Sequence, residues 1–440
     1  MKNYLQVAKW RVTTFGSMHE SVAVVISAIS DVMLAQSAYT VAHAGFKESL
    51  KLQIECFGLY HVNVADEYTK LGVLFMRMSH EKGRSQDINE LMTLDVGHPK
   101  QLVDGDKDQN FRNALSLEFL EKAAKIYRIN QKYSKLSKTL EMSAEIKQIL
   151  HQDLLALHSY REALDAEFAS GFVVCADTAH EREKMLRVAR IQNVIGLLMY
   201  NVANYSASLR SFSEVLRIKR DILNLSDDTV VTTLVNIGHG HYKMNDLTQA
   251  LRVYKEALTM KELVVCEEGK DISSTLDTML TYVKSNPKVI GSDNADIISQ
   301  NLEEMSRILN YIGVVQEAIG DRKAALVTFK MALQIQQILS QSGGRESTLA
   351  IMMEKVGLLQ FQGSKYLDAL YSFSEALRLK QLKSNGEPTV DIAHTMNSIG
   401  NVYYSINNLD ESLSIYQQAL QIKKARLGKD HLDVANTLVS

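Results

Sequence analysis

The chain has 440 residues, of which 46% are hydrophobic and 23% charged, and its formal net charge is −2. This composition is typical of well-folded proteins. The near balance of charge excludes an overall basic surface, which disfavours nucleic acid and anionic membranes as partners. Three cysteines, far apart and odd in number, indicate no disulfide framework, so we expect a cytoplasmic location. The apolar stretch at 21–36 is interrupted by polar residues well short of a membrane span.

The start of the chain contains a sequence motif that occurs twice more. Residues 1–14 read as the end of a helix, which Phe15–Ala23 ("FGSMHESVA") follows. The other copies are Phe57–Ala65 ("FGLYHVNVA") and Leu427–Ala435 ("LGKDHLDVA"). We interpret the motif as a joint, in which Phe or Leu closes one helix and the glycine adopts a left-handed conformation. The N-caps of the helices that follow joints are expected to be Ser21, Asn63 and Asp433, and the same position in other units holds Thr229, Thr348 and Asp391.

A fixed register then runs through the chain. Each unit is marked by one small residue, and these are Ser30, Gly72, Ala144, Gly196, Gly238, Gly313, Gly357 and Gly400. In seven units Ala or Ser stands 12 residues later, Phe or Tyr 16 later, and a small residue or valine 19 later. The pattern predicts antiparallel hairpins of a helix A and a helix B that cross closely, with Gly196 facing Val215 and Gly400 facing Ala419.

Each hairpin leaves an apolar face for the next one to cover, so the predicted fold is an all-α, right-handed superhelical solenoid of antiparallel helix hairpins. In the unit of Gly72, the small residue Ala123 stands 51 residues on rather than 19, which places an insertion of 32 residues. We assign about 81–110 to a polar loop within it. A second insertion, 266–297, holds an extra helix, either in the place of a helix A or on the outside.

These features divide the chain into four parts. They are a partial helix B with its joint (1–18), N-terminal repeats (19–265), the insertion with the extra helix (266–297), and C-terminal repeats that end inside a unit (298–440). Because solenoids normally end in polar capping elements, we expect either a piece of a longer array or ends that meet partner surfaces.

The small residue of each "LG" or "IG" pair, the Ala or Ser, the aromatic four further on and the "AL" pair resemble the tetratricopeptide repeat family. The joints and the 42-residue period resemble the longer repeat of kinesin light chains. The resemblance implies a scaffold or adaptor, not an enzyme, that binds a peptide or partner protein in a concave groove. Three alternatives stay open: a regulatory or targeting segment of a larger protein, a kinesin-light-chain-like cargo adaptor and an RNA-binding helical repeat.

In that family the groove is lined by helix A residues three before, one after and four after the small residue. Transferred to this chain, these positions give the candidates Asn193, Tyr200, His239, Tyr242, Asn310, Asn397, Asn401 and Tyr404. Charged candidates that can attract an acidic segment are Arg190, Lys243 and Arg307. Asparagine can bond a peptide backbone, and tyrosine offers anchor area. Each candidate also has the plainer interpretation of a solvent-facing or packing residue.

No cofactor and no metal are expected. The joint histidines His19, His61 and His431 belong to units displaced by about 10 Å, whereas zinc ligands lie about 2 Å from a shared ion. We expect these histidines to hold the joints by hydrogen bonds. No Ser/His/Asp or Cys/His set is recognisable, and Glu303 and Glu304 read as a solvated helix face, which disfavours an enzyme.

Overall fold

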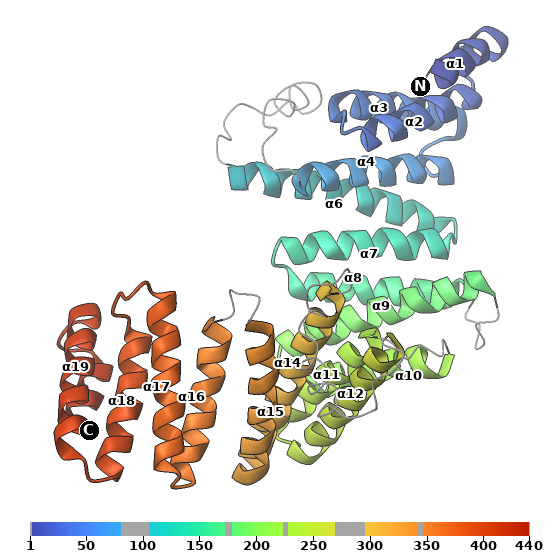
Figure 1. Cartoon of the computed structure of the whole chain (residues 1–440). Coiled ribbons are helices and arrows are strands. Elements are labelled where there is room, and N and C mark those ends of the chain that lie inside the picture. Colours follow the sequence, from blue (N-terminus) through green and yellow to red (C-terminus); the bar gives the residue numbers. More distant parts are fainter. Residues whose placement is uncertain are drawn as a thin grey trace. The chain divides into compact units, whose positions relative to one another are not determined.

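The computed structural model describes residues 2–80, 105–171, 178–222, 228–268, 295–340 and 346–439. These residues form eighteen α-helices and one short π-helix, and no strand occurs among them. They group into two compact units, Met1–Leu223 and Asn224–Ser440, each a succession of helices (Figure 1). The predicted all-α fold of stacked hairpins is confirmed, and the hand of the superhelix stays a prediction.

The N-terminal unit contains four hairpins. They are α2 (Glu20–Ala35) with α3 (Tyr39–Phe57), α4 (Val62–His80) with α6 (Gly105–Ile129), α7 (Tyr133–Ile149) with α8 (Asp153–Ala169), and α9 (Ala179–Asn201) with α10 (Tyr205–Arg217). The helix α1 (Lys2–Phe15) packs on α2, and the π-helix η1 (Ile218–Ile222) continues α10. Helix B of one hairpin packs on helix A of the next, so neighbours cover each other's apolar faces.

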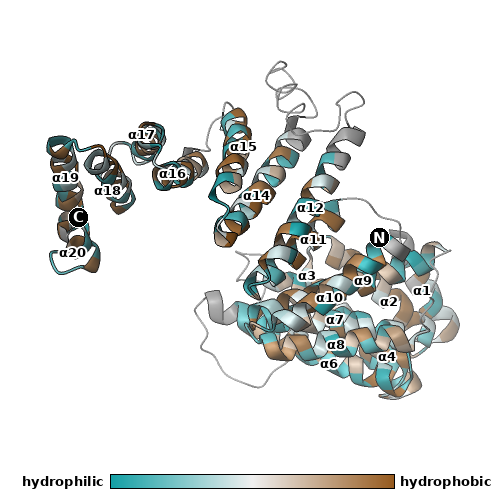
Figure 2. Ribbon diagram, turned by 90° about the horizontal axis from the view of Figure 1, so that it is seen from below, coloured by the Kyte–Doolittle hydropathy of each residue, from teal (hydrophilic) through white to brown (hydrophobic). Residues whose placement is uncertain are grey.

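The C-terminal unit repeats the arrangement with four more hairpins. They are α11 (Asp228–Lys243) with α12 (Leu247–Glu268), α14 (Ala295–Ile319) with α15 (Arg322–Ser340), α16 (Glu346–Gln362) with α17 (Tyr366–Lys383), and α18 (Val390–Ser405) with α19 (Leu409–Leu427). The helix α20 (Leu432–Val439) packs on α19. Helices such as α14 and α15 carry apolar and polar residues side by side (Figure 2), as expected of helices that bury one face.

The glycines of helix A lie directly against aromatic rings of helix B. A Cβ atom added to Gly196 would lie 2.6 Å from Cε1 of Phe212, and one added to Gly400 would lie 2.8 Å from Cε1 of Tyr416. Real Cβ atoms essentially never come closer than 3.0 Å to a heavy atom, so only glycine lets the ring lie flat on the helix. The expectation that Gly196 faces Val215 is therefore wrong, because the facing residue is the aromatic one turn earlier.

The small residue at position 19 faces a different part of helix A. Ser49 Oγ donates to the carbonyl of Ala23 at 3.0 Å, and Ala419 shares a buried cluster with Ala393. Both partners stand seven residues before the small residue that marks their unit. The expected pair of Gly400 and Ala419 is therefore wrong as well. The contact between the two helices extends over several turns, so Ala419 lies nearer to Ala393 than to Gly400 along helix A.

The hairpin of α4 and α6 keeps this register across its insertion. Ser116 Oγ donates to the carbonyl of Gly72 at 2.6 Å, the bond that Ser208 makes to Gly196 at 2.8 Å. The separations are 44 and 12 residues, and their difference of 32 equals the insertion predicted from the sequence. Residues 105–110 belong to α6, while 81–104 lie outside the described residues.

The extra helix predicted within 266–297 falls mostly outside the described residues. The helix α12 ends at Glu268 and α14 begins at Ala295, and 269–294 between them are not described.

At the joints, the histidine caps the helix that follows. His19 Nδ1 accepts a hydrogen bond from the Ser21 backbone N–H at 3.1 Å, and His61 does the same for Asn63 at 3.2 Å. His431 repeats the bond with the Asp433 N–H at 3.2 Å. The N-caps predicted at Ser21, Asn63 and Asp433 are therefore wrong by two positions, because imidazole nitrogen takes the part of the usual side-chain oxygen. The helix α18 shows the same offset, with Thr389 rather than Asp391 as its cap.

The rest of the joint holds the histidine ring in place. The ring of His61 stacks on Phe57 with centroids 4.3 Å apart, and His19 stacks on Phe15 at 4.8 Å. The intervening Gly58 has φ +82° and ψ 168°, a region essentially restricted to glycine. The positive φ predicted for the joint glycine is confirmed, and its role is to turn the chain so that cap and stack form together.

Candidate partner-binding surface

Two of the predicted groove residues hold tyrosine hydroxyl groups. His239 Nδ1 lies 2.6 Å from the Tyr254 hydroxyl, and the Tyr416 hydroxyl donates to Asn401 Oδ1. Three hairpins with phenylalanine at this place have an apolar residue opposite; the pairs are Phe212 with Leu197, Phe329 with Val314, and Phe373 with Leu358. Tyr254 is buried, and a buried hydroxyl needs a hydrogen-bond partner, so His239 serves the packing of its own hairpin. Tyr416 is half-buried, and its bond ties the exposed Asn401 to helix B.

His239 is also enclosed by the next hairpin. Its ring meets the ring of Tyr311 on α14, with centroids 4.5 Å apart and planes at 83°. Burial lowers the pKa of His239, and the nearby Lys243 adds to this. The imidazole is therefore kept neutral between α11 and α14, which suits packing better than capture of an acidic ligand.

Two of the predicted asparagines link successive A helices. Asn310 Oδ1 on α14 accepts from Lys355 Nζ on α16 at 3.0 Å. Asn397 Nδ2 on α18 donates to Thr437 Oγ1 on α20 at 2.9 Å. Asn397 Oδ1 is buried and meets no hydrogen-bond donor within the described part of the chain. These side chains are thus partly committed to holding the stack together.

Arg190, predicted to attract an acidic segment, is already paired. Its guanidinium on α9 binds both carboxylate oxygens of Glu141 on α7, at 2.7 and 3.0 Å. The hydrogen bond to Glu141 raises the pKa of Arg190. Because its charge is matched by a residue of the same unit, Arg190 acts as a link between two A helices.

The other six predicted residues point at least partly to solvent. Asn193, Tyr200 and Tyr242 are half-buried, and Lys243, Arg307 and Tyr404 are exposed. Tyr200 meets the ring of Tyr205 edge-on at 5.3 Å. Tyr404 is 63% exposed, and tyrosine is a residue type enriched at interfaces. These residues fit a contact surface better than the five that bond within the chain.

Sequence reasoning missed a buried polar position on helix B. The residue 23 after the marking residue is polar and largely buried in several hairpins; examples are Gln53, Glu167, Lys261, Gln336, Lys380 and Lys423. Lys261 is 0% exposed and binds Asp228 at 2.5 Å and Glu304 at 2.7 Å. The signal was a polar residue at one fixed register position, where burial between helices would favour an apolar one.

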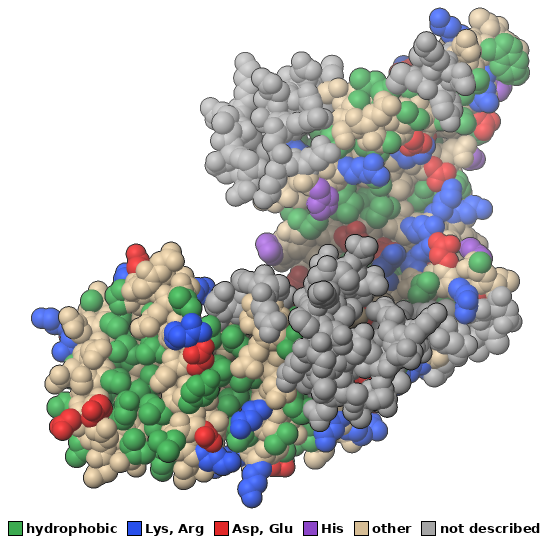
Figure 3. Space-filling view, in the orientation of Figure 1, with side chains coloured by type: hydrophobic (Ala, Val, Ile, Leu, Met, Phe, Trp, Pro, Cys, Tyr) green, Lys and Arg blue, Asp and Glu red, His purple; other side chains and the backbone are tan. Residues whose placement is uncertain are grey.

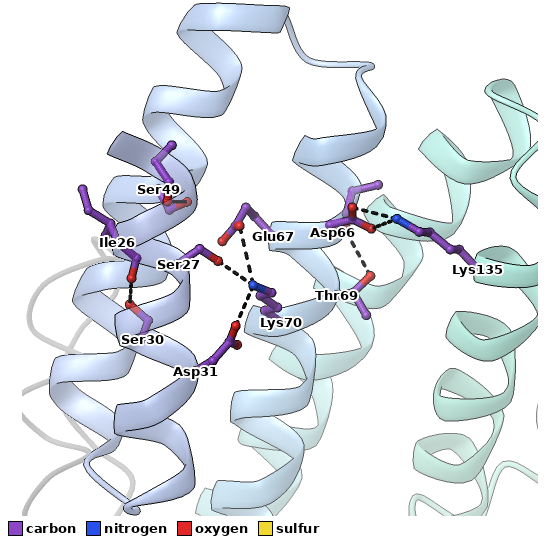
Figure 4. Close-up of polar contacts among 12 residues, drawn as sticks. Ile26, Ser27, Ser30, Asp31, Ser49, Asp66, Glu67, Thr69, Lys70 and Lys135 are labelled. Atoms are coloured by element: carbon purple, nitrogen blue, oxygen red, sulfur yellow. Dashed lines mark hydrogen bonds and ion pairs between the residues drawn. The ribbon is translucent and has the colours of Figure 1, made fainter. Parts of the chain in front are cut away.

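The N-terminal unit has an open pocket of about 680 Å³ between α2, α4 and α7, and none of the predicted groove residues lines it. Asp66 and Lys135 pair across one side at 2.7 Å. On the other side, Lys70 Nζ donates to Ser27 Oγ at 2.6 Å and Asp31 at 2.8 Å (Figure 4).

Glu67 stands beside this pocket and is only 4% exposed. Burial raises its pKa, and Asp31 adds to this, whereas hydrogen bonding with Ser27 and Ser49 and the charge of Lys70 act against it. The carboxylate occupies a position that is threonine on α7, α11 and α18, namely Thr139, Thr233 and Thr395. An acid in place of a buried threonine is the sequence signal that could have pointed to this pocket.

Residues 230–265 and 392–433 match the family model of the tetratricopeptide repeat. Together with eight hairpins in one register, these matches identify tetratricopeptide repeats, which support a protein-interaction scaffold. The chain is also similar to proteins named as kinesin-light-chain-related. It is 22% identical to Protein KINESIN LIGHT CHAIN-RELATED 2 of Arabidopsis thaliana over 373 residues, which cover 82% of this chain and 51% of that protein.

The chain is also similar to a second relative and to a solved structure. Protein KINESIN LIGHT CHAIN-RELATED 1 of Arabidopsis thaliana is 20% identical over 251 residues, 55% of this chain and 40% of that protein. The crystal structure of part of a TPR repeat-containing protein from Cytophaga hutchinsonii covers 80% of this chain and 94% of that one, with 13% identity and a TM-score of 0.46. The chain spans about half the length, or less, of the two curated relatives. Within its described residues, no helix combines the length and apolarity needed to span a membrane.

Proposed function

We propose that the C-terminal unit binds a peptide or partner protein along the exposed side of its A helices. The observation that carries the proposal is a pair of exposed apolar side chains, one on each of two A helices. These two helices contact each other. Leu358 on α16 is 44% exposed and Tyr404 on α18 is 63% exposed. They stand one and four residues after Gly357 and Gly400, the register positions expected to line a groove. Exposed apolar groups that gather on one surface mark interaction sites.

The surroundings of these side chains support a mixed apolar and polar contact. On the face drawn in Figure 3, hydrophobic side chains gather over α16 to α19, with charged groups among them. Asn401 is exposed, and because its Oδ1 accepts from Tyr416, its Nδ2 group keeps two N–H donors for a peptide carbonyl. Lys243 and Arg307 are exposed cations of the same unit. A partner segment with an apolar anchor and an acidic residue fits this chemistry.

The test compares two exposed tyrosines. Tyr404→Ala removes the proposed anchor, and Tyr371→Ala removes a 69% exposed tyrosine from helix B of the neighbouring hairpin. Peptides selected from a random display library on the wild-type chain are titrated against both variants by fluorescence anisotropy. We expect Tyr404→Ala to weaken binding at least tenfold, as for an aromatic hot spot, and Tyr371→Ala to leave it unchanged. Equal effects of the two variants, or no selected peptide, would overturn the proposal.

The alternative of a kinesin-light-chain-like cargo adaptor uses the same surface. This alternative is supported by the names of the two curated relatives. The other alternative, a regulatory or targeting segment of a larger multidomain protein, is supported by the fraction of those relatives that the chain spans. Under either alternative the chain acts by binding and not by catalysis. Binding of single-stranded RNA is the third alternative, and it predicts an affinity for RNA that falls steeply with salt concentration. Salt titrations of the affinity for the selected peptide and for an RNA of mixed sequence distinguish peptide binding from RNA binding.

A further inference from the structure

The pocket of the N-terminal unit contains two buried oxygen atoms that meet no donor. Glu67 Oε2 and Gln53 Oε1 are both buried without a hydrogen-bond partner in the described part of the chain. The two residues are 4% and 2% exposed, and both line the pocket. A buried acceptor without a donor is costly and uncommon in native proteins. Two in one pocket indicate that a donor arrives from outside the chain.

Other hairpins show which donor belongs at this place. Gln53 stands 23 residues after Ser30, a position that is lysine in three hairpins of the C-terminal unit (Lys261, Lys380 and Lys423) and glutamine in the fourth (Gln336). There Lys380 Nζ donates to Glu354 at 2.7 Å and to Thr395 at 3.0 Å, and Lys423 Nζ donates to Thr437 at 2.9 Å. In those hairpins an ammonium group from helix B satisfies helix A. In the hairpin of α2 and α3 that ammonium is replaced by the amide of Gln53, and the threonine of the next helix A is replaced by Glu67.

The charges beside Glu67 leave room for one more cation. Asp31 and Glu67 share the ammonium of Lys70, which lies 2.8 Å from Asp31 and 4.0 Å from Glu67. Asp66 turns away from them and pairs with Lys135 (Figure 4). Lys70 lies within hydrogen-bond distance of Asp31 but not of Glu67. Glu67 is therefore the carboxylate that a second cation would pair with.

We propose that this pocket binds a lysine or arginine side chain of a partner segment, with Glu67 and Gln53 as its acceptors. An ammonium has three N–H donors and a guanidinium five, enough for both oxygens at once. The bond to Glu67 is charge-assisted, and burial strengthens it. The inference rests on the proposed function, since it gives the N-terminal unit a partner residue of stated charge, and it assigns that residue to a surface separate from Tyr404.

The experiment measures the preference for a cation directly. Four libraries of nonapeptides carry lysine, norleucine, arginine or citrulline at the centre and random residues elsewhere, and peptides captured by the full chain are quantified by mass spectrometry. Norleucine and citrulline keep the shape of lysine and arginine but carry no charge. The variants are Glu67→Gln, which removes the charge at constant shape, and Glu20→Gln, which removes an exposed carboxylate from the rim of the same pocket.

We expect the wild-type chain to capture the lysine or arginine library at least tenfold over its neutral counterpart. Glu67→Gln should abolish that preference, whereas Glu20→Gln and Tyr404→Ala should keep it. A wild-type chain without the preference, or a Glu67→Gln chain that retains it, overturns the inference. If peptides are captured without a preference for the cation but depend on Tyr404, the proposed function stands and only this inference fails. If the wild-type chain captures no peptide from any library, both fail.

Discussion

Replacing helix A glycines by alanine tests the packing on which every hairpin depends. At Gly196 the added Cβ would lie 2.6, 2.9 and 3.0 Å from three carbons of the Phe212 ring. That ring is 1% exposed and has no open space to move into. Alanine gains about 1 kcal/mol over glycine in a helix interior, while overpacking a core costs about 1–3 kcal/mol. Because three ring carbons lie within 3.0 Å of the added Cβ, the cost should fall in the upper part of that range, about 2–3 kcal/mol. We therefore expect Gly196→Ala to lower the free energy of unfolding by about 1–2 kcal/mol.

Gly357 provides the matched control. Its added Cβ would lie 3.0 Å or more from the ring of Phe373, so a shift of a few tenths of an ångström relieves the contact, and the helical gain of about 1 kcal/mol offsets the cost. Gly357→Ala should therefore leave stability nearly unchanged, and Gly313→Ala, with 2.8 Å to Phe329, should fall between the two.

Urea unfolding followed by circular dichroism gives the stabilities. Amide hydrogen exchange in the altered helix reports the local loss, because repeat arrays need not unfold in one step. If Gly196→Ala is as stable as the wild-type chain, or more stable than Gly357→Ala, the ring does not set the helix distance and the packing described here is wrong.

Three further predictions test separate contacts. His239→Leu removes the hydrogen bond to the Tyr254 hydroxyl and should lower the free energy of unfolding by about 1–2 kcal/mol. Adding Tyr254→Phe should restore most of that stability, because other hairpins combine phenylalanine with an apolar residue. Urea unfolding measures both variants, and a double variant no more stable than His239→Leu alone contradicts the prediction. His61→Ala removes the cap of α4 and its stack on Phe57 and should cost about 1 kcal/mol, with faster hydrogen exchange in the first turn of α4 as the readout, and unchanged exchange would refute the cap. Because burial raises the pKa of Glu67, the wild-type chain should lose stability as the pH rises above 4.5 and through that raised pKa, whereas Glu67→Gln does not titrate. The variant should therefore match the wild type at pH 4 and be more stable than it at pH 8. Equal urea midpoints at both pH values would show that burial does not disfavour the charged carboxylate.

The sequence by itself determined the hairpins, their number and their register. The spacing of Gly196 to Phe212 and its counterparts recurs along the chain, and such a period reflects contacts between helices that are neighbours in sequence. The offset of 32 residues at Gly72 was visible for the same reason, since an insertion shifts the period without changing the contact.

Only the tertiary structure decided which side chains meet. His61 was recognised as a joint residue, but that its ring nitrogen caps α4 depends on the backbone turn at Gly58. Asn401 was predicted at a groove position, but its Oδ1 accepts a hydrogen bond from the Tyr416 hydroxyl. Gln53 and Glu67 belong to different hairpins, and their meeting at one pocket follows from how far each hairpin is rotated on the last. Spacing along a helix fixes the face on which a residue lies, whereas its partner across the stack depends on crossing angle and rotation, which are set by the packing of all neighbouring side chains.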